Sequence, residues 1–281
     1  MLRIDAHQHF WVYDPIRDSW ITEDMGKIRR DLLPGDLAPL LKENKVDGCV
    51  AVQAAESLEQ TDFLLELARK NDFIKAVVGW IDLKDSALED TLAVYKDAKK
   101  LKGFRHTLQG EDIPAYLADG SFENGVKAIL EKGYTYDLLV YHHQMESIFQ
   151  MVSRLSENGG GRFVLDHLGK PDLRTGDIAN WKKQIYQVAK IPTVYCKVSG
   201  LVTEADWNTW TADGLKEALD TVLEAFGPNR LMFGSDWPVC LVATSYQNWM
   251  QTASNYFKQL SESENAAIFG GNACQFYGIE N

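Results

Sequence analysis

Short apolar runs alternate with polar loops and with longer segments of helical periodicity along most of the chain. Most of these runs are almost continuously apolar, which is typical of strands that are covered on both faces, as in a parallel sheet. The pattern predicts eight strands, which are Leu2–His7, Asp47–Gln53, Ala76–Ile81, Lys102–His106, Tyr136–Val140, Arg162–His167, Thr193–Val198 and Leu231–Asp236.

The segments between these runs carry signals for the start and the end of helices. Three of them open on a serine that is followed three residues later by Glu or Gln, at Ser57, Ser86 and Ser261. This spacing is the capping-box pattern. Asn158-Gly159 and Gly227-Pro228 follow apolar stripes of helical spacing, as residues that end helices do. We therefore expect helices between the strands.

Eight strand-then-helix units in 281 residues match the (β/α)8 barrel, or TIM barrel, which typically needs about 250 residues. An open doubly wound sheet is the alternative fold. Against it, the first strand is not followed by a Gly-x-Gly-x-x-Gly pattern, and Gly159–Gly161 precedes a strand, so we interpret the triple glycine as a turn. We predict a single domain over residues 1–281, with the long segment Trp11–Pro34 folded over the barrel mouth.

Composition and charge narrow the class of partner. The formal charge of −11 disfavours nucleic acid and anionic membranes, because both attract clustered Lys and Arg. We therefore expect a small-molecule partner. No apolar run approaches the roughly 20 residues of a membrane helix, and no basic-then-apolar leader precedes Ile4, so we expect a cytoplasmic protein. The four cysteines form no Cys-x-x-Cys pair, which argues against disulfides and a zinc finger.

Active sites of (β/α)8 barrels gather at the C-terminal ends of the strands. Four of the six histidines lie at predicted ends, namely His7, His9, His106 and His167. His7 and His9 stand two residues apart, so in extended backbone they share one face. Asp236 ends the last predicted strand. The placement predicts a functional cluster of His7, His9, His167 and Asp236.

Four motifs lie at these ends, and they are Asp5–Trp11, Leu165–Pro171, Cys196–Leu201 and Phe233–Pro238. Together they resemble the amidohydrolase superfamily, and more narrowly its sugar-lactonase branch, over essentially the whole chain. That branch includes L-fuconolactonase-like enzymes and, more distantly, 2-pyrone-4,6-dicarboxylate lactonase. The resemblance implies hydrolysis of a sugar lactone to its open acid.

The resemblance also implies roles for the cluster. Asp236 would be the general base that takes a proton from the attacking water, with His7, His9 and His167 around the lactone carbonyl. A carboxylate ringed by imidazoles can stay ionised and still accept a proton as negative charge moves onto the lactone oxygen. The alternative is that Asp236 is a turn residue, because Ser235-Asp236 precedes Trp237-Pro238.

The resemblance bears on metal as well. Binuclear members of the superfamily bridge two ions with a carboxylated lysine at the end of the fourth strand, whereas here that end reads Phe104-Arg105-His106. We therefore expect at most one divalent ion, such as Zn²⁺. The lactonase branch is said to work without metal, so no cofactor is expected to be required, and Arg105 or His106 would supply the positive charge. The candidate ligands are His7, His9, His167 and Asp236.

Other residues at the strand ends are candidate substrate contacts. Polar side chains can hydrogen-bond sugar hydroxyls and tryptophans can pack against the ring, although Arg and Lys can equally neutralise buried carboxylates. This predicted set is Gln53, Trp80, Arg105, His106, Lys197 and Trp237. We interpret His142-His143 as surface residues, and Glu204 stays outside the catalytic set because Thr203 before it suits a helix cap.

Two other functions stay open from the sequence. A mononuclear metal-dependent amidohydrolase or decarboxylase would use the same histidines, and a non-catalytic sugar-binding barrel would keep the polar rim without needing Asp236. A nucleophilic serine hydrolase is disfavoured, because the chain has no Gly-x-Ser-x-Gly elbow.

Overall fold

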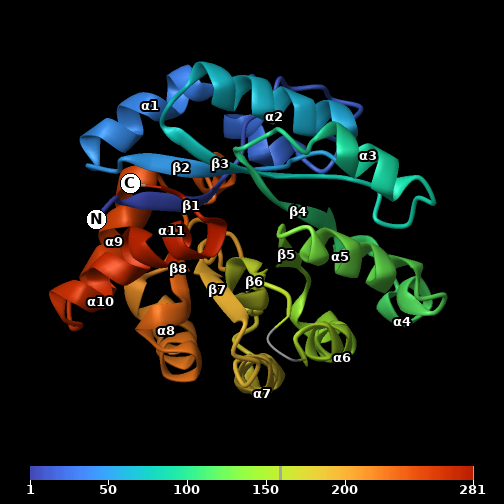
Figure 1. Ribbon diagram of the computed structural model, residues 1–281. Helices are drawn as coiled ribbons and strands as arrows, with labels where there is room; N and C mark the ends of the chain where they lie inside the picture. Colours follow the sequence, from blue (N-terminus) through green and yellow to red (C-terminus); the bar gives the residue numbers. More distant parts are fainter. Residues whose placement is uncertain (158–159, 281) are drawn as a thin grey trace.

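Eight parallel strands form one sheet, in chain order, in the computed structural model, which describes residues 1–157 and 160–280 (Figure 1). A parallel bridge between Gln8 and Trp237 joins the first strand to the segment after the last, and this bridge closes the barrel. The fold is therefore the predicted (β/α)8 barrel. The strands are β1 (Ile4–Gln8), β2 (Gly48–Val52), β3 (Ile74–Gly79), β4 (Leu101–Thr107), β5 (Thr135–Leu139), β6 (Phe163–Leu165), β7 (Val194–Val198) and β8 (Leu231–Phe233).

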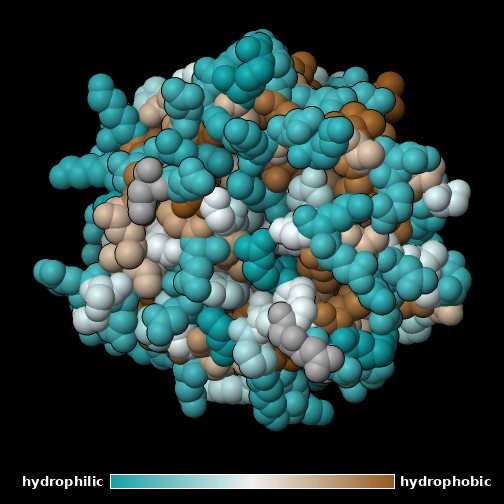
Figure 2. Space-filling view, viewed as in Figure 1, coloured by the Kyte–Doolittle hydropathy of each residue, from teal (hydrophilic) through white to brown (hydrophobic). Residues whose placement is uncertain are grey.

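Helices surround the sheet (Figure 1). They are α1 (Pro34–Glu43), α2 (Leu58–Lys70), α3 (Leu88–Val94), α4 (Ile113–Leu117), α5 (Ser121–Glu131), α6 (Met145–Leu155), α7 (Ala179–Val188), α8 (Ala212–Phe226), α9 (Tyr246–Phe257), α10 (Glu262–Ala266) and α11 (Asn272–Tyr277). None of these described helices is long and apolar enough to cross a membrane. Polar and charged side chains cover most of the face in Figure 2, with apolar residues in small separate patches.

All eight predicted strands are present, but five of them end one to three residues earlier than predicted, and the difference matters most in β6 and β8. β6 stops at Leu165 and β8 stops at Phe233. The physical reason is that His167 and Asp236 adopt φ values of 54° and 56°, in the left-handed region that no strand contains. Both side chains therefore sit on tight turns directly after the strands.

The predicted helix signals are largely confirmed. Ser57 caps α2 and Ser261 caps α10, each through its side-chain oxygen, and Gly227 ends α8 with a φ of 66°. The prediction at Ser86 is wrong, because α3 begins after Ala87, whose amide donates to the Asp85 carboxylate in the preceding turn. Asn158-Gly159, and with it the first residue of the triple glycine, lies outside the described residues.

The barrel interior has two layers of different chemistry. The lower layer is apolar and includes Ile4, Val50 and Val78, and the C-terminal helix α11 adds Phe276 and Tyr277 to the same cluster. The upper layer, toward the C-terminal strand ends, carries buried charged side chains, which are described below. A second and larger apolar cluster lies between the sheet and the surrounding helices.

Gly125 shows how closely the outer layer packs. It lies inside α5, and a Cβ there would stand 1.9 Å from the Leu83 carbonyl oxygen. We predict that Gly125→Ala lowers the free energy of unfolding by about 2 kcal/mol or more, because backbone has to move to admit the methyl group. Urea titration measures this change.

Gly35→Ala is the matched control, because Gly35 is helical too and a Cβ there would meet nothing within 4 Å. It should leave stability unchanged or raise it slightly, since alanine favours helix over glycine. Equal effects of the two substitutions would contradict the packing argument.

Candidate active site

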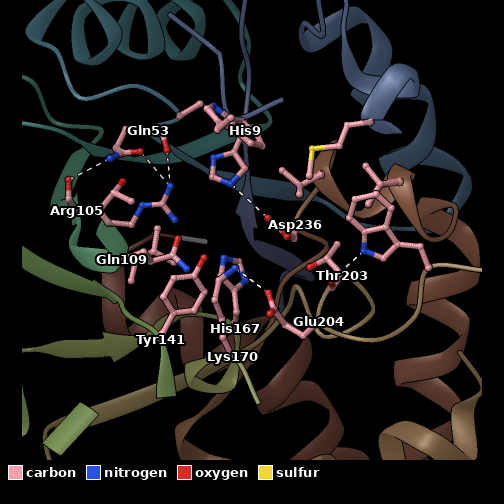
Figure 3. A pocket seen from close by; sticks show the side chains of 18 residues that line it. His9, Gln53, Arg105, Gln109, Tyr141, His167, Lys170, Thr203, Glu204 and Asp236 are labelled. Atoms are coloured by element: carbon pink, nitrogen blue, oxygen red, sulfur yellow. Dashed lines mark hydrogen bonds and ion pairs between the residues drawn. The ribbon is translucent and has the colours of Figure 1, made fainter. Parts of the chain in front are cut away.

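A pocket of about 420 Å³ lies at the C-terminal ends of the strands. Five of the predicted site residues line it, namely His9, Gln53, Arg105, His167 and Asp236 (Figure 3). Trp20 and Met25, from the long segment after β1, line it as well. That segment is held in place by paired backbone hydrogen bonds between Trp11 and Leu32. It therefore forms part of the wall of the mouth, as the sequence predicts.

Asp236 faces two imidazoles. Its Oδ1 lies 3.3 Å from Nε2 of His9 and 3.8 Å from Nε2 of His7, and the two Nε2 atoms are 3.2 Å apart. Nδ1 of His9 lies 2.9 Å from the Val52 carbonyl oxygen, which can only accept, so this nitrogen carries the proton. In neutral His9 the Nε2 lone pair therefore points toward Asp236.

His7, His9 and Asp236, called the triad below, could hold a single divalent ion. Four ligands at about 2.0–2.1 Å from a tetrahedral Zn²⁺ stand about 3.3 Å from one another, which is close to the separations of 3.2, 3.3 and 3.8 Å found here. Asp166 Oδ1 lies 3.3 Å from Nδ1 of His7, as the outer carboxylate of a metal-binding histidine often does. His167 belongs to a second potential group, with His7 and Asp166.

His167 is brought against the triad by its turn and by a close glycine. Its ring centroid lies 4.5 Å from that of His7, and its Nδ1 is 3.0 Å from the Ser199 hydroxyl. A Cβ on Gly200, which has a φ of 60°, would stand 2.4 Å from Nδ1 of His167. Burial lowers the pKa of His167 to about 4, so the ring is neutral at pH 7.

The Asp236 carboxyl is ionised at neutral pH. Burial alone would raise its pKa, but the attraction of the neighbouring His167, His9 and His7 rings in their protonated form lowers it by more, and the pKa falls well below its usual range. A buried carboxylate directed into a pocket is an acceptor for the proton of a bound water or hydroxyl.

Arg105 is a fixed cation in the pocket wall, with 4% of the residue exposed. Nη2 donates to both the backbone and the side-chain oxygen of Gln53, and Nη1 donates to Asp166 Oδ2 at 3.0 Å. Nη1 also lies 3.3 Å from Nε2 of His7. The guanidinium is therefore held in one orientation beside the triad.

Lys197 lies beneath the pocket and does not line it. The side chain is fully buried, and its Nζ pairs with Asp137 and, at 3.0 Å, with Asp166 Oδ1. Tyr277 of α11 donates to Asp137 from below, at 2.9 Å. Burial raises the pKa of Asp137 to about 6, so this carboxyl is still ionised at pH 7. The interior ion network, Arg105, Asp137, Asp166 and Lys197, thus supports the site from underneath.

Besides Lys197, three more predicted substrate contacts lie outside the pocket lining, namely Trp80, His106 and Trp237. Trp80 donates through Nε1 to Nδ1 of His106 at 3.2 Å, so Nε2 of His106 carries the proton and faces the Tyr116 hydroxyl at 3.1 Å. This arrangement belongs to a neutral imidazole, and burial lowers the pKa of His106. Trp237 is 1% exposed and packs edge-on against Phe10.

The sequence reasoning missed several residues that the structure brings to the site. Asp137 interrupts the apolar run of β5 and Asp166 directly follows β6, and a charged residue in such a place is a signal that the sequence offers. Other missed residues line the pocket from segments that follow the strands, where no periodicity marks them, and they include Gln109, Tyr141, Lys170, Thr203, Glu204 and Trp207.

Asp5 ties the site to the barrel. Its Oδ1 accepts the backbone amides of Ser235 at 2.8 Å and of His7 at 3.2 Å, so one carboxylate holds the ends of β1 and β8 together. The residue is completely buried, and burial raises the pKa of Asp5 from 3.8 to about 6. The folded state therefore holds this proton more tightly than the unfolded state does.

Asp5→Asn should change how stability depends on pH. Because the folded wild type binds this proton more tightly than the unfolded chain does, protonation of Asp5 adds to the free energy of unfolding below pH 4. This contribution is lost as the pH rises to about 6. The amide does not titrate, so the free energy of unfolding of the variant should rise relative to that of wild type across this interval, by about 3 kcal/mol in total. Urea titrations at pH 4.5 and 7.5 measure roughly 2 kcal/mol of this gain, because the unfolded carboxyl is already mostly ionised at pH 4.5. A difference between the two proteins that does not vary with pH would contradict the prediction.

Comparison with known proteins identifies a matching family and similar chains. The profile of a family described as Amidohydrolase matches residues 4–279. An L-fucono-1,5-lactonase from Burkholderia multivorans is 41% identical, with 99% of this chain and 96% of that protein covered, and one from Burkholderia ambifaria is 34% identical with the same coverage. A crystal structure of an amidohydrolase from Burkholderia multivorans with bound zinc has a TM-score of 0.95 and 41% identity, and covers 100% of both chains.

Proposed function

Since this chain belongs to the amidohydrolase family, and since its 41%-identical relative is an L-fucono-1,5-lactonase, we propose that it hydrolyses an aldono-1,5- or 1,4-lactone to the open acid. One observation supports the chemistry above all others. It is the buried Asp236 carboxyl that faces two imidazoles inside a pocket of about 420 Å³. A pocket of this size suits one sugar ring.

The carboxylate provides a base for water. As the water oxygen bonds to the lactone carbonyl carbon, Asp236 takes its proton, and negative charge moves onto the carbonyl oxygen. Arg105 supplies a fixed positive charge for that oxyanion, and because it is held by Gln53 and Asp166 it needs no reorganisation. His167 contributes a neutral imidazole beside the reacting atoms.

Asp236 also serves the second step, in which the lactone ring opens. The bond between the carbonyl carbon and the ring oxygen breaks, and Asp236 returns the proton to the departing oxygen, which becomes a hydroxyl. Asp236 is then ionised again. The product is a carboxylic acid, and its ionisation in solution releases the proton that an indicator dye detects.

A metal ion is compatible with this site. His7, His9 and Asp236 would hold it, and Zn²⁺ bound there would polarise the carbonyl and lower the pKa of water. The zinc in the crystal structure of the 41%-identical amidohydrolase supports such binding. A lactone is an activated ester, however, so a carboxylate base and a fixed guanidinium can suffice.

An indicator assay over a panel of aldonolactones, with L-fucono-1,5-lactone included, tests the proposal. Hydrolysis of one or more members is expected. If the folded protein hydrolyses no member of the panel, the lactonase assignment is overturned. A metal-dependent amidohydrolase or decarboxylase, or a sugar-binding barrel, is then favoured.

Asp236→Asn should lower kcat by roughly 10²-fold or more, because the amide keeps the shape of the side chain but cannot accept a proton. Steady-state kinetics on the best lactone measures this loss. Asp97→Asn, at an exposed position away from the pocket, is the matched control and should retain full turnover. Near-complete turnover by Asp236→Asn would exclude this residue as the base.

Activity should survive prolonged chelation, because the positive charge at the carbonyl comes from Arg105. Turnover is compared before and after chelator treatment, with elemental analysis of both samples, and at most one metal ion per chain is expected. If one equivalent of zinc is present, and its removal abolishes activity while its return restores it, then His7 and His9 are essential ligands and the metal-independent route is wrong.

A further inference from the structure

We propose that the ion pair between Lys170 and Glu204 recognises ring hydroxyls of the lactone and decides which stereoisomers are hydrolysed. This inference rests on the proposed lactonase function. It concerns two residues of the pocket lining that take no part in the catalytic steps described above.

The pair is built into the pocket. Lys170 follows β6 and Glu204 follows β7, and Nζ of Lys170 lies 2.8 Å from Oε1 of Glu204. Both residues line the pocket together with His167 and Asp236, and Figure 3 shows them side by side next to His167. Their side chains are 18% and 19% exposed, whereas those of Lys182 and Glu217, an ion pair of the same length between α7 and α8, are 35% and 64% exposed.

The backbone places Lys170 at some conformational cost. His167, Leu168, Gly169 and Lys170 all have φ between 52° and 68°, a region that residues other than glycine rarely adopt. Buried contacts hold this turn, since Trp181 donates to the Leu168 carbonyl at 2.6 Å.

A second contact fixes the end of the turn. Nδ1 of His142 lies 3.1 Å from the Lys170 carbonyl oxygen and therefore donates to it. The Lys170 ammonium also lies 5.8 Å from the centre of the Tyr141 ring, within the range of a cation–π contact. The backbone and the side chain of Lys170 are thus both held at the pocket wall.

The ion pair offers a donor and an acceptor side by side, which suits two neighbouring hydroxyls of a sugar ring. The Lys170 ammonium has three N–H donors, of which one is directed at Glu204, and Oε2 of Glu204 is a further acceptor. One ring hydroxyl can accept from the ammonium while its neighbour donates to the carboxylate. Such hydrogen bonds to charged groups are among the stronger ones in proteins.

An apolar part of the pocket lining makes this recognition directional. Met25, Leu139, Val239 and Val242 line the pocket too, and their side chains offer no strong donor or acceptor. An epimer that turns a hydroxyl toward these residues loses its water without gaining a partner. The pair and the apolar residues together therefore favour one arrangement of ring hydroxyls over its epimers.

The test is a specificity ratio. We compare kcat/KM for the best aldonolactone with kcat/KM for its ring epimers and for δ-valerolactone, which has no hydroxyls, in wild type, Glu204→Gln and Lys170→Met. The best substrate should lose roughly 10- to 100-fold. Its advantage over the epimers should shrink by a similar factor, while the rate on δ-valerolactone changes little.

The surface pair provides matched controls. Glu217→Gln and Lys182→Met remove an ion pair of equal length and should leave every rate unchanged. Thermal midpoints of all variants verify folding, and Glu204→Gln keeps the shape of the side chain if Lys170→Met proves unstable.

Two results would overturn the inference. An equal loss on all lactones would mean that the pair only holds two loops together, and an unchanged epimer ratio would mean that it does not contact the sugar. If the wild-type protein hydrolyses no aldonolactone, the lactonase proposal itself is overturned, and this inference with it.

Discussion

The site depends on charge compensation inside the barrel. Asp137 on β5 and Lys197 on β7 are both buried, and either one alone would carry a large desolvation penalty. Together with Asp166 and Arg105 they form a network in which each charge has an opposite partner. This requirement links β4, β5, β6 and β7, so these four strands have to lie in the correct register for the charges to be paired.

The network also orients the triad. Asp166 approaches Nδ1 of His7, while Arg105 approaches the opposite ring nitrogen. His7 is therefore contacted on both edges, and its ring directs Nε2 toward His9 and Asp236. Beneath these charges, α11 closes the apolar lower layer and contributes the Tyr277 hydroxyl to Asp137. Such preorganisation is how enzymes stabilise developing charge without a reorganisation penalty.

The backbone changes conformation where the chemistry begins. The strands are regular up to Leu165 and Phe233, and the left-handed turns after them carry His167 and Asp236 into the pocket. Gly200 allows the loop after β7 to approach His167 closely. Regular strands give the barrel its rigidity, and the less favourable turns, which are held by buried contacts, give the side chains their direction.

The sequence by itself determined the eight strands, the barrel, and the placement of His7, His9, His167 and Asp236 together at one end of it, because apolar periodicity and strand ends are local features. It also carried the amidohydrolase resemblance, which the family match confirms. Only the tertiary structure decided that Trp80 and His106 bind each other, that Lys197 lies below the pocket, and that Glu204 lines it. The physical reason is that burial, pairing and loop position depend on partners distant in sequence, such as Asp137 for Lys197 and Lys170 for Glu204.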